Sequence, residues 1–128
     1  AEVYLDRVTE IAATSEAQMR FHSAETLLGT VAAILKGELH RKAGEFEAAI
    51  AAFDRAVELE DSLMYDEPEP LPFAARHWLG AILLEMERYD EALAPLEMAR
   101  ELGPDERLTL LSLGDANLKL GRAEQALG

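Results

Sequence analysis

Apolar residues recur every three or four positions along most of the chain, which is the spacing of amphipathic α-helices. The clearest run contains two such segments, one from Ser23 to about Lys42 and one from Phe46 to Glu60. Ser23 is a favourable N-cap residue, and Gly44 supplies the backbone freedom that ends the first segment. We therefore expect two antiparallel helices joined by a short turn.

Two landmarks recur in register, a glycine in the first helix and an alanine in the second. The glycines are Gly37, Gly80 and Gly114, and the alanines are Ala49, Ala92 and Ala126. Both landmarks move by 43 residues and then by 34. Two independent markers that move together indicate an array of helix pairs, in which stacked neighbours complete the core. For Gly37, a close approach of two helices would offset the low helix propensity of glycine.

The remaining chain is also predicted to be helical, and no segment predicts a strand. The further helices are expected at residues 2–13, 16–21, 72–87, 89–102 and 106–120, with another beginning at 122. The segment 16–21 follows Ser15, which together with Gln18 has the spacing of a capping box. Pro95 predicts a modest bend inside its helix. Prolines at 68, 70 and 72 exclude a continuous helix between the first two pairs.

The composition narrows the class of protein. The chain has 128 residues, of which 49% are hydrophobic and 29% charged, as in globular domains. No apolar run approaches the roughly 18 residues that cross a bilayer, and no secretory signal is visible, so a cytoplasmic location is favoured. The absence of cysteine excludes disulfides and cysteine-ligated metals. A net charge of −13 disfavours nucleic acid and anionic membrane surfaces as partners.

These residues resemble the tetratricopeptide repeat, a 34-residue helix–turn–helix unit with small residues at two packing positions and an aromatic residue at a third. The resemblance implies an all-α, right-handed superhelix. Its parts are a helical segment at 1–29, repeats at 30–63 and 73–106, a proline-rich acidic loop at 64–72, and a truncated third repeat at 107–128. The truncation suggests a piece of a longer array. Glu87 departs from the family pattern, since it replaces the glycine between the two helices. Residues 37–85 also look like a group of bacterial tetratricopeptide proteins with no assigned activity.

The resemblance implies non-enzymatic binding of a protein or peptide on the concave face, which the first helix of each pair lines. By position, that face presents Ile34, Glu38, Arg41, His77, Ala81, Leu111 and Asp115. A family subclass that clamps terminal carboxylates uses lysine, arginine and asparagine there. Glu38 and Asp115 disfavour that subclass and favour a basic or mixed apolar partner. Exposed apolar ends would also allow end-to-end association of copies.

The acidic loop is a second candidate region, with Tyr65, Asp66 and Glu67 at its start. Its carboxylates lack the spacing and glycine of an EF-hand, so a solvated acidic loop is expected rather than a calcium site. The loop could help to select the partner. An alternative function is small-molecule or signal sensing, with an apolar pocket under residues 65–73 that Tyr65, His77 and Trp78 would line. Another alternative is a scaffold surface whose binding site lies in further repeats.

Motifs for catalysis and for cofactors are missing. The three histidines, His22, His40 and His77, have neither paired nor HExxH spacing. No glycine-rich phosphate loop follows a strand, and no serine lies in an elbow motif. We expect no catalytic residue, no cofactor and no metal. An enzyme would require a pocket that pairs Glu38 with His77.

Overall fold

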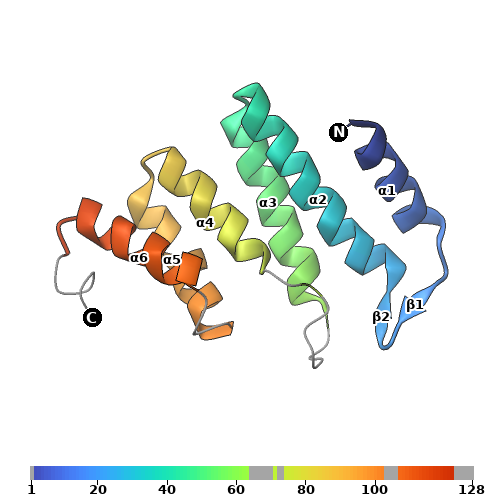
Figure 1. Ribbon diagram of the computed structural model, residues 1–128. Coiled ribbons are helices and arrows are strands. Elements are labelled where there is room, and N and C mark those ends of the chain that lie inside the picture. The colour runs from blue at the N-terminus through green and yellow to red at the C-terminus, as the bar shows by residue number, and fades with distance from the viewer. Residues whose placement is uncertain (1, 64–70, 72–73, 103–106, 123–128) are drawn as a thin grey trace. The chain divides into compact units, whose positions relative to one another are not determined.

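The computed structural model describes residues 2–63, 71, 74–102 and 107–122, and these residues are mainly helical. The elements follow one another as shown in Figure 1. They are α1 (Glu2–Thr14), β1 (Gln18–Met19), β2 (His22–Ser23), α2 (Ala24–Ala43), α3 (Phe46–Asp61), α4 (Ala75–Glu85), α5 (Tyr89–Leu102) and α6 (Arg107–Lys119). The chain divides into two compact units, one up to Ala75 and one from Arg76 onward.

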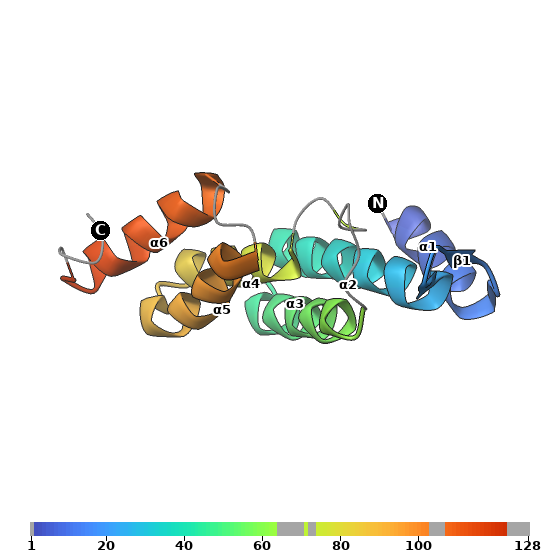
Figure 2. The same ribbon diagram turned by 90° about the horizontal axis from the view of Figure 1, so that it is seen from below.

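In the first unit, α2 is the central helix. It packs against α1 on one side and against α3 on another (Figure 2). The apolar stripe of α3 forms the best-buried part of this unit, because Ala49, Phe53 and Ala56 recur at helical spacing and are all fully buried. The outer helix α1 is less tightly packed, and Ala12 is its one buried residue.

The ends of α2 follow the chemistry expected from the sequence. The Ser23 hydroxyl accepts a hydrogen bond from the Thr26 backbone N–H at 3.1 Å, which makes Ser23 the N-cap. Gly44 ends the helix in the left-handed conformation with φ 78°, and its N–H donates to the Arg41 carbonyl at 3.1 Å. Both ends of α2 are therefore determined by hydrogen bonds between residues close together in the sequence.

A glycine in the first helix of each pair admits a large side chain from the second helix. A methyl group added at Gly37 would lie 2.7 Å from Phe53 Cδ1, and one added at Gly80 would lie 2.5 Å from Leu96 Cγ. Phe53 and Leu96 are both buried, and each lies sixteen residues after its glycine. The close helix–helix approach expected at Gly37 is confirmed, and Gly80 repeats it in the second unit.

The turn between α4 and α5 uses Glu87 in place of glycine. Glu87 has φ 58°, in the left-handed region that non-glycine residues rarely adopt. Its N–H donates to the Leu84 carbonyl at 3.0 Å, and the Arg88 N–H donates to the Leu83 carbonyl at 2.8 Å. The turn thus keeps the hydrogen bonds of a glycine-ended helix with a strained backbone at one residue.

The helix predicted for residues 16–21 is wrong, and so is the expectation that the chain has no strand. Two short strands, β1 and β2, form an antiparallel hairpin in which Met19 pairs with His22. The Ser15 hydroxyl accepts from the Ala17 N–H at 3.2 Å, two residues on, and so makes a turn rather than a helix cap. Arg20, with φ 57°, lies in the tip of the hairpin.

The other helix boundaries agree with the predictions to within two residues, apart from those of α4. This helix begins at Ala75 and ends at Glu85, whereas the sequence predicted 72–87. Residues 72–73, where the helix was expected to begin, lie outside the described residues, as does most of the helix expected from 122. Pro95 lies inside α5 as expected, and the bend stays a prediction.

Replacement of Gly37 by alanine should lower the free energy of unfolding by about 1–3 kcal/mol, because the added methyl group meets the buried Phe53 ring. Gly29 in the same helix is the matched control. A methyl group there would make an ordinary 3.4 Å contact with Leu59, so Gly29→Ala should stabilise by up to about 1 kcal/mol. Urea unfolding of both variants measures this, and equal stabilities would contradict the packing argument.

Replacement of Glu87 by glycine should raise the free energy of unfolding by about 1 kcal/mol, because glycine adopts φ 58° without a steric penalty. Gly121, with φ 72°, offers the opposite exchange, and Gly121→Ala should destabilise by a similar amount. Thermal unfolding of the two variants against wild type provides the measurement. A loss of stability in Glu87→Gly would show that the glutamate side chain itself stabilises the turn.

Candidate functional site

Three of the predicted concave-face residues lie on α2 in the first unit. The Arg41 guanidinium makes a bidentate ion pair with the Glu38 carboxylate, with Nε to Oε1 at 3.0 Å and Nη2 to Oε2 at 3.1 Å. Ile34 is half-buried and packs against a cluster that contains Ala33 and Ala56. This part of α2 therefore presents a paired charge beside an apolar side chain, so the carboxylate of Glu38 is already bound.

His77 in the second unit holds two helices together. Its Nδ1 lies 2.8 Å from the hydroxyl of Thr109, so that α4 and α6 are joined by a hydrogen bond between residues 32 positions apart. Thr109 is fully buried, and the hydrogen bond satisfies its hydroxyl. His77 thus has a structural role, and its replacement would disturb packing as well as any binding surface.

The other predicted residues of the second unit are exposed. They are Ala81 on α4 and Leu111 and Asp115 on α6. The side chain of Leu111 is 69% exposed, a large value for leucine. The inner face of α6 is formed instead by its buried residues, which are Thr109, Leu113, Ala116 and Asn117.

Leu118 extends this exposed surface and was missed from the sequence. It is 62% exposed and lies seven residues after Leu111, so the two leucines project from the same side of α6 with Asp115 between them. The spacing of four and then three residues was the signal that could have identified it. Together, Leu111, Asp115 and Leu118 form what we call the α6 strip.

The acidic loop residues Tyr65, Asp66 and Glu67 lie outside the described residues, but a hydrogen bond joins the helices on either side of the loop. Glu60, at the end of α3, accepts a hydrogen bond from the backbone N–H of Ala75 at 2.8 Å. Ala75 is the first residue of α4, where a negative charge is favourable. Among the described residues, no group of three or more His, Cys, Asp or Glu side chains is arranged to hold a metal ion.

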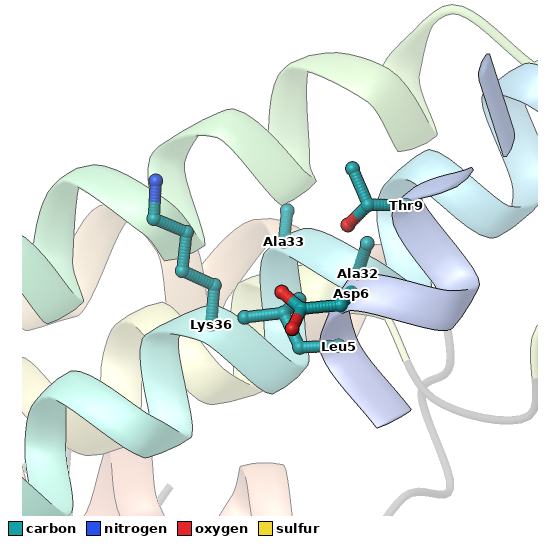
Figure 3. A pocket seen from close by; sticks show the side chains of 6 residues that line it. All are labelled: Leu5, Asp6, Thr9, Ala32, Ala33 and Lys36. Carbon is teal, nitrogen blue, oxygen red and sulfur yellow. The ribbon is translucent and has the colours of Figure 1, made fainter. Parts of the chain in front are cut away.

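The described residues of the first unit line pockets beside the chain's second helix, α2. One of about 400 Å³ lies between α1 and α2 and is lined by Leu5, Asp6, Thr9, Ala32, Ala33 and Lys36 (Figure 3). Another, of about 310 Å³, lies beside the hairpin and is mainly apolar, with a lining of Ala17, Gln18, Met19, Ala24, Leu27, Leu28, Val31 and Leu71. The sequence predicted neither pocket. The pocket expected under residues 65–73 includes positions outside the described residues.

The histidines occupy separate environments. His22 is a buried residue of strand β2, and the His40 Nδ1 lies 2.5 Å from Glu45 Oε2 across the α2–α3 turn. Glu38 makes its bidentate contact with Arg41, and His77 contacts Thr109. In the described part of the chain, no helix combines the length and hydropathy that crossing a membrane demands.

The pKa of the Glu91 carboxyl group is shifted. Arg88 donates hydrogen bonds to Glu91 at 2.8 Å and 2.6 Å in the first turn of α5, and these bonds hold the pKa of Glu91 below its ordinary value. Burial acts in the opposite direction, and the charge of Arg88 adds to the lowering. The pair is exposed, so it orders the start of α5 without a large contribution to stability.

The helix pairs α2–α3 and α4–α5 repeat one antiparallel arrangement built on the same glycine contact, which defines a helical-repeat protein. A model of the tetratricopeptide repeat family matches residues 34–107 and 82–128. The chain belongs to this family. A solved structure of a MamA mutant is similar, with a TM-score of 0.59 and 20% sequence identity over 98% of this chain and 89% of that one. No curated protein matches the chain.

Family and structure together confirm the all-α helical-repeat class that the sequence predicted. Tetratricopeptide repeats are in general a non-enzymatic fold for protein interaction, and this supports a protein-binding scaffold. At 20% identity, the likeness to MamA shows the fold and does not transfer a partner. The alternative of a small-molecule sensor under residues 65–73 has no support from the family.

Replacement of Arg88 by alanine should raise the pKa of Glu91 towards its ordinary value, because the hydrogen bonds that stabilise the carboxylate are lost. In wild type the folded-state pKa is the lower one. The contribution of the pair is therefore present above the unfolded-state pKa and is lost as the pH falls through the folded-state pKa. NMR titration of the Glu91 carboxyl carbon in both proteins measures the shift, and an unchanged pKa in the variant would contradict this assignment.

Proposed function

We propose that the protein is a scaffold that binds a protein or peptide segment on the concave face of its repeats. The observation that carries this proposal is the α6 strip, in which Leu111 and Leu118 are mostly exposed on one side of the helix. A partner that covers these exposed leucines removes their apolar surface from water, which favours binding. The family's general role in protein interaction supports the same conclusion.

In the first unit, the predicted binding residues include a charged pair on α2. The Glu38–Arg41 pair is partly exposed, and both groups can exchange a mutual contact for contacts with a partner. Such an exchange costs little net free energy, because one ion pair replaces another. This pair therefore favours selectivity between partners more than affinity.

The proposed partner segment is apolar with basic flanks. Asp115 lies between the two exposed leucines of the α6 strip, and the whole chain has a net charge of −13. Opposite charge accelerates the encounter and excludes acidic segments. The apolar side chains would contact the leucines, while a neighbouring lysine or arginine would approach Asp115.

A selection of random peptides displayed on phage tests this function. Wild-type protein should enrich peptides in which leucine, isoleucine or phenylalanine stands next to lysine or arginine. The double variant Leu111→Asp, Leu118→Asp should bind the enriched peptides at least about tenfold more weakly, which corresponds to about 1.4 kcal/mol. Fluorescence anisotropy with labelled peptides measures the affinities.

Met98→Asp is the matched control for this test. Met98 is an exposed apolar residue on α5, the second helix of its pair, and lies outside the proposed face. This variant should bind the selected peptides as wild type does. Equal weakening in Met98→Asp, or full binding in the double variant, would move the site away from the α6 strip. Selected peptides rich in aspartate and glutamate would contradict the proposed charge preference.

The end-to-end association of copies expected from the sequence stays a prediction. Val3 and Tyr4 on α1 are each 76% exposed and supply apolar side chains for such a contact. The role of the acidic loop in partner selection is likewise a proposal, since Tyr65, Asp66 and Glu67 lie outside the described residues.

A further inference from the structure

The pocket between α1 and α2 combines an apolar floor with three polar side chains. Leu5, Ala32 and Ala33 supply the apolar part. Asp6 and Thr9 line it from α1 and Lys36 from α2, around one space of about 400 Å³, and Figure 3 shows the Lys36 side chain extended away from the Asp6 carboxylate. This volume lies within the range of small-molecule sites.

Lys36 departs from the pattern of the other repeats in a way that leaves this space open. The residues at the same repeat position are Leu79 and Leu113, both of which are buried in the second unit. In the first unit the position is an exposed lysine. A leucine there would fill the contact between α2 and its neighbour, whereas lysine places a charge at the border of the pocket.

The polar groups of the pocket are available to a ligand. Within residues 2–63, 71, 74–102 and 107–122, the side chains of Asp6 and Lys36 take part in no hydrogen bond or ion pair, and in particular they do not pair with each other. Elsewhere on the first unit, ion pairs form readily, as between Arg7 and Glu10 and between Arg41 and Glu38. Beside one pocket, a carboxylate and an ammonium group that are unpaired within the described residues favour a ligand that has both a positive and a negative charge.

We propose that this pocket binds a small zwitterion, specifically a free α-amino acid with an apolar side chain. The ammonium group would pair with Asp6 and the carboxylate with Lys36, and Thr9 would add a hydrogen bond. The side chain of the ligand would rest on Leu5 and the two alanines. Binding would bridge α1 to α2, and α1 is otherwise held by few buried residues.

The site is separate from the concave face and does not depend on the proposed function. Ile34 and Lys36 are two positions apart on α2 and therefore point about 200° apart around the helix. A ligand between α1 and α2 would leave the Glu38–Arg41 pair untouched. Amino-acid binding and peptide binding can accordingly be measured on one sample without interference.

NMR titration of the labelled full chain with a panel of free amino acids tests the proposal. Amide signals of Leu5, Thr9, Ala32 and Ala33 should shift saturably with at least one apolar amino acid at concentrations up to about 10 mM. N-acetyl and amide derivatives of the same amino acid, each of which lacks one charge, should bind at least about tenfold more weakly. These derivatives test the charge requirement on the wild-type protein.

Variants locate the binding groups. Asp6→Asn and Lys36→Gln should each weaken binding at least about tenfold, while Glu10→Gln on α1 and Lys42→Gln on α2 should leave it unchanged. The proposal is overturned if no amino acid produces saturable shifts at these residues, if the blocked derivatives bind equally well, or if both pocket variants retain wild-type affinity. A coupling between Asp6 and Lys36 in the stability of the ligand-free protein would also overturn it, because the two charges would then serve each other.

Discussion

Each helix pair depends on a contact between a glycine backbone and a large side chain sixteen residues later. The contact brings two helices close enough to bury Phe53 in the first unit and Leu96 in the second. Burial of such a side chain stabilises by roughly 1.5–3 kcal/mol, which exceeds the cost of about 1 kcal/mol for glycine inside a helix. The small residues Ala49 and Ala92, both fully buried, accompany the contact in each pair. Each pair is thus defined by a glycine, whose missing side chain lets the second helix pack directly against the backbone of the first.

The helix pairs could be predicted because their signals are local and repeated. The 3.6-residue periodicity, the Ser23 cap and the left-handed Gly44 all act within one turn of helix. The hairpin at residues 18–23 could not be predicted, because Ser15 and Gln18 have the spacing of a helix capping box. Ser15 bonds to the N–H two residues on rather than three, and a sequence does not distinguish these choices when few apolar residues favour either.

The candidate surfaces divide in the same way. Leu111 was predicted from helical spacing, and the same spacing relates Glu38 to Arg41 and Leu111 to Leu118, although neither the ion pair nor Leu118 was predicted. The His77–Thr109 hydrogen bond does not, because its partners are 32 positions apart and meet only through packing. The pocket between α1 and α2 also escaped prediction, since α1 precedes the repeats and the family pattern says nothing of its position. Lys36 can be identified as a pocket residue only once α1 is known to pack beside α2.

The constant separation of sixteen residues has a consequence for how such a chain can change during evolution. One turn contains Gly44 and the other Glu87, so the identity of the turn residue varies while the length between the contact partners does not. An insertion within either turn would rotate the second helix and carry its large side chain past the glycine. An insertion between pairs leaves both partners in register. The first repeat step is nine residues longer than the second. The additional residues fall between α3 and α4, where they do not change the separation of either pair of contact partners.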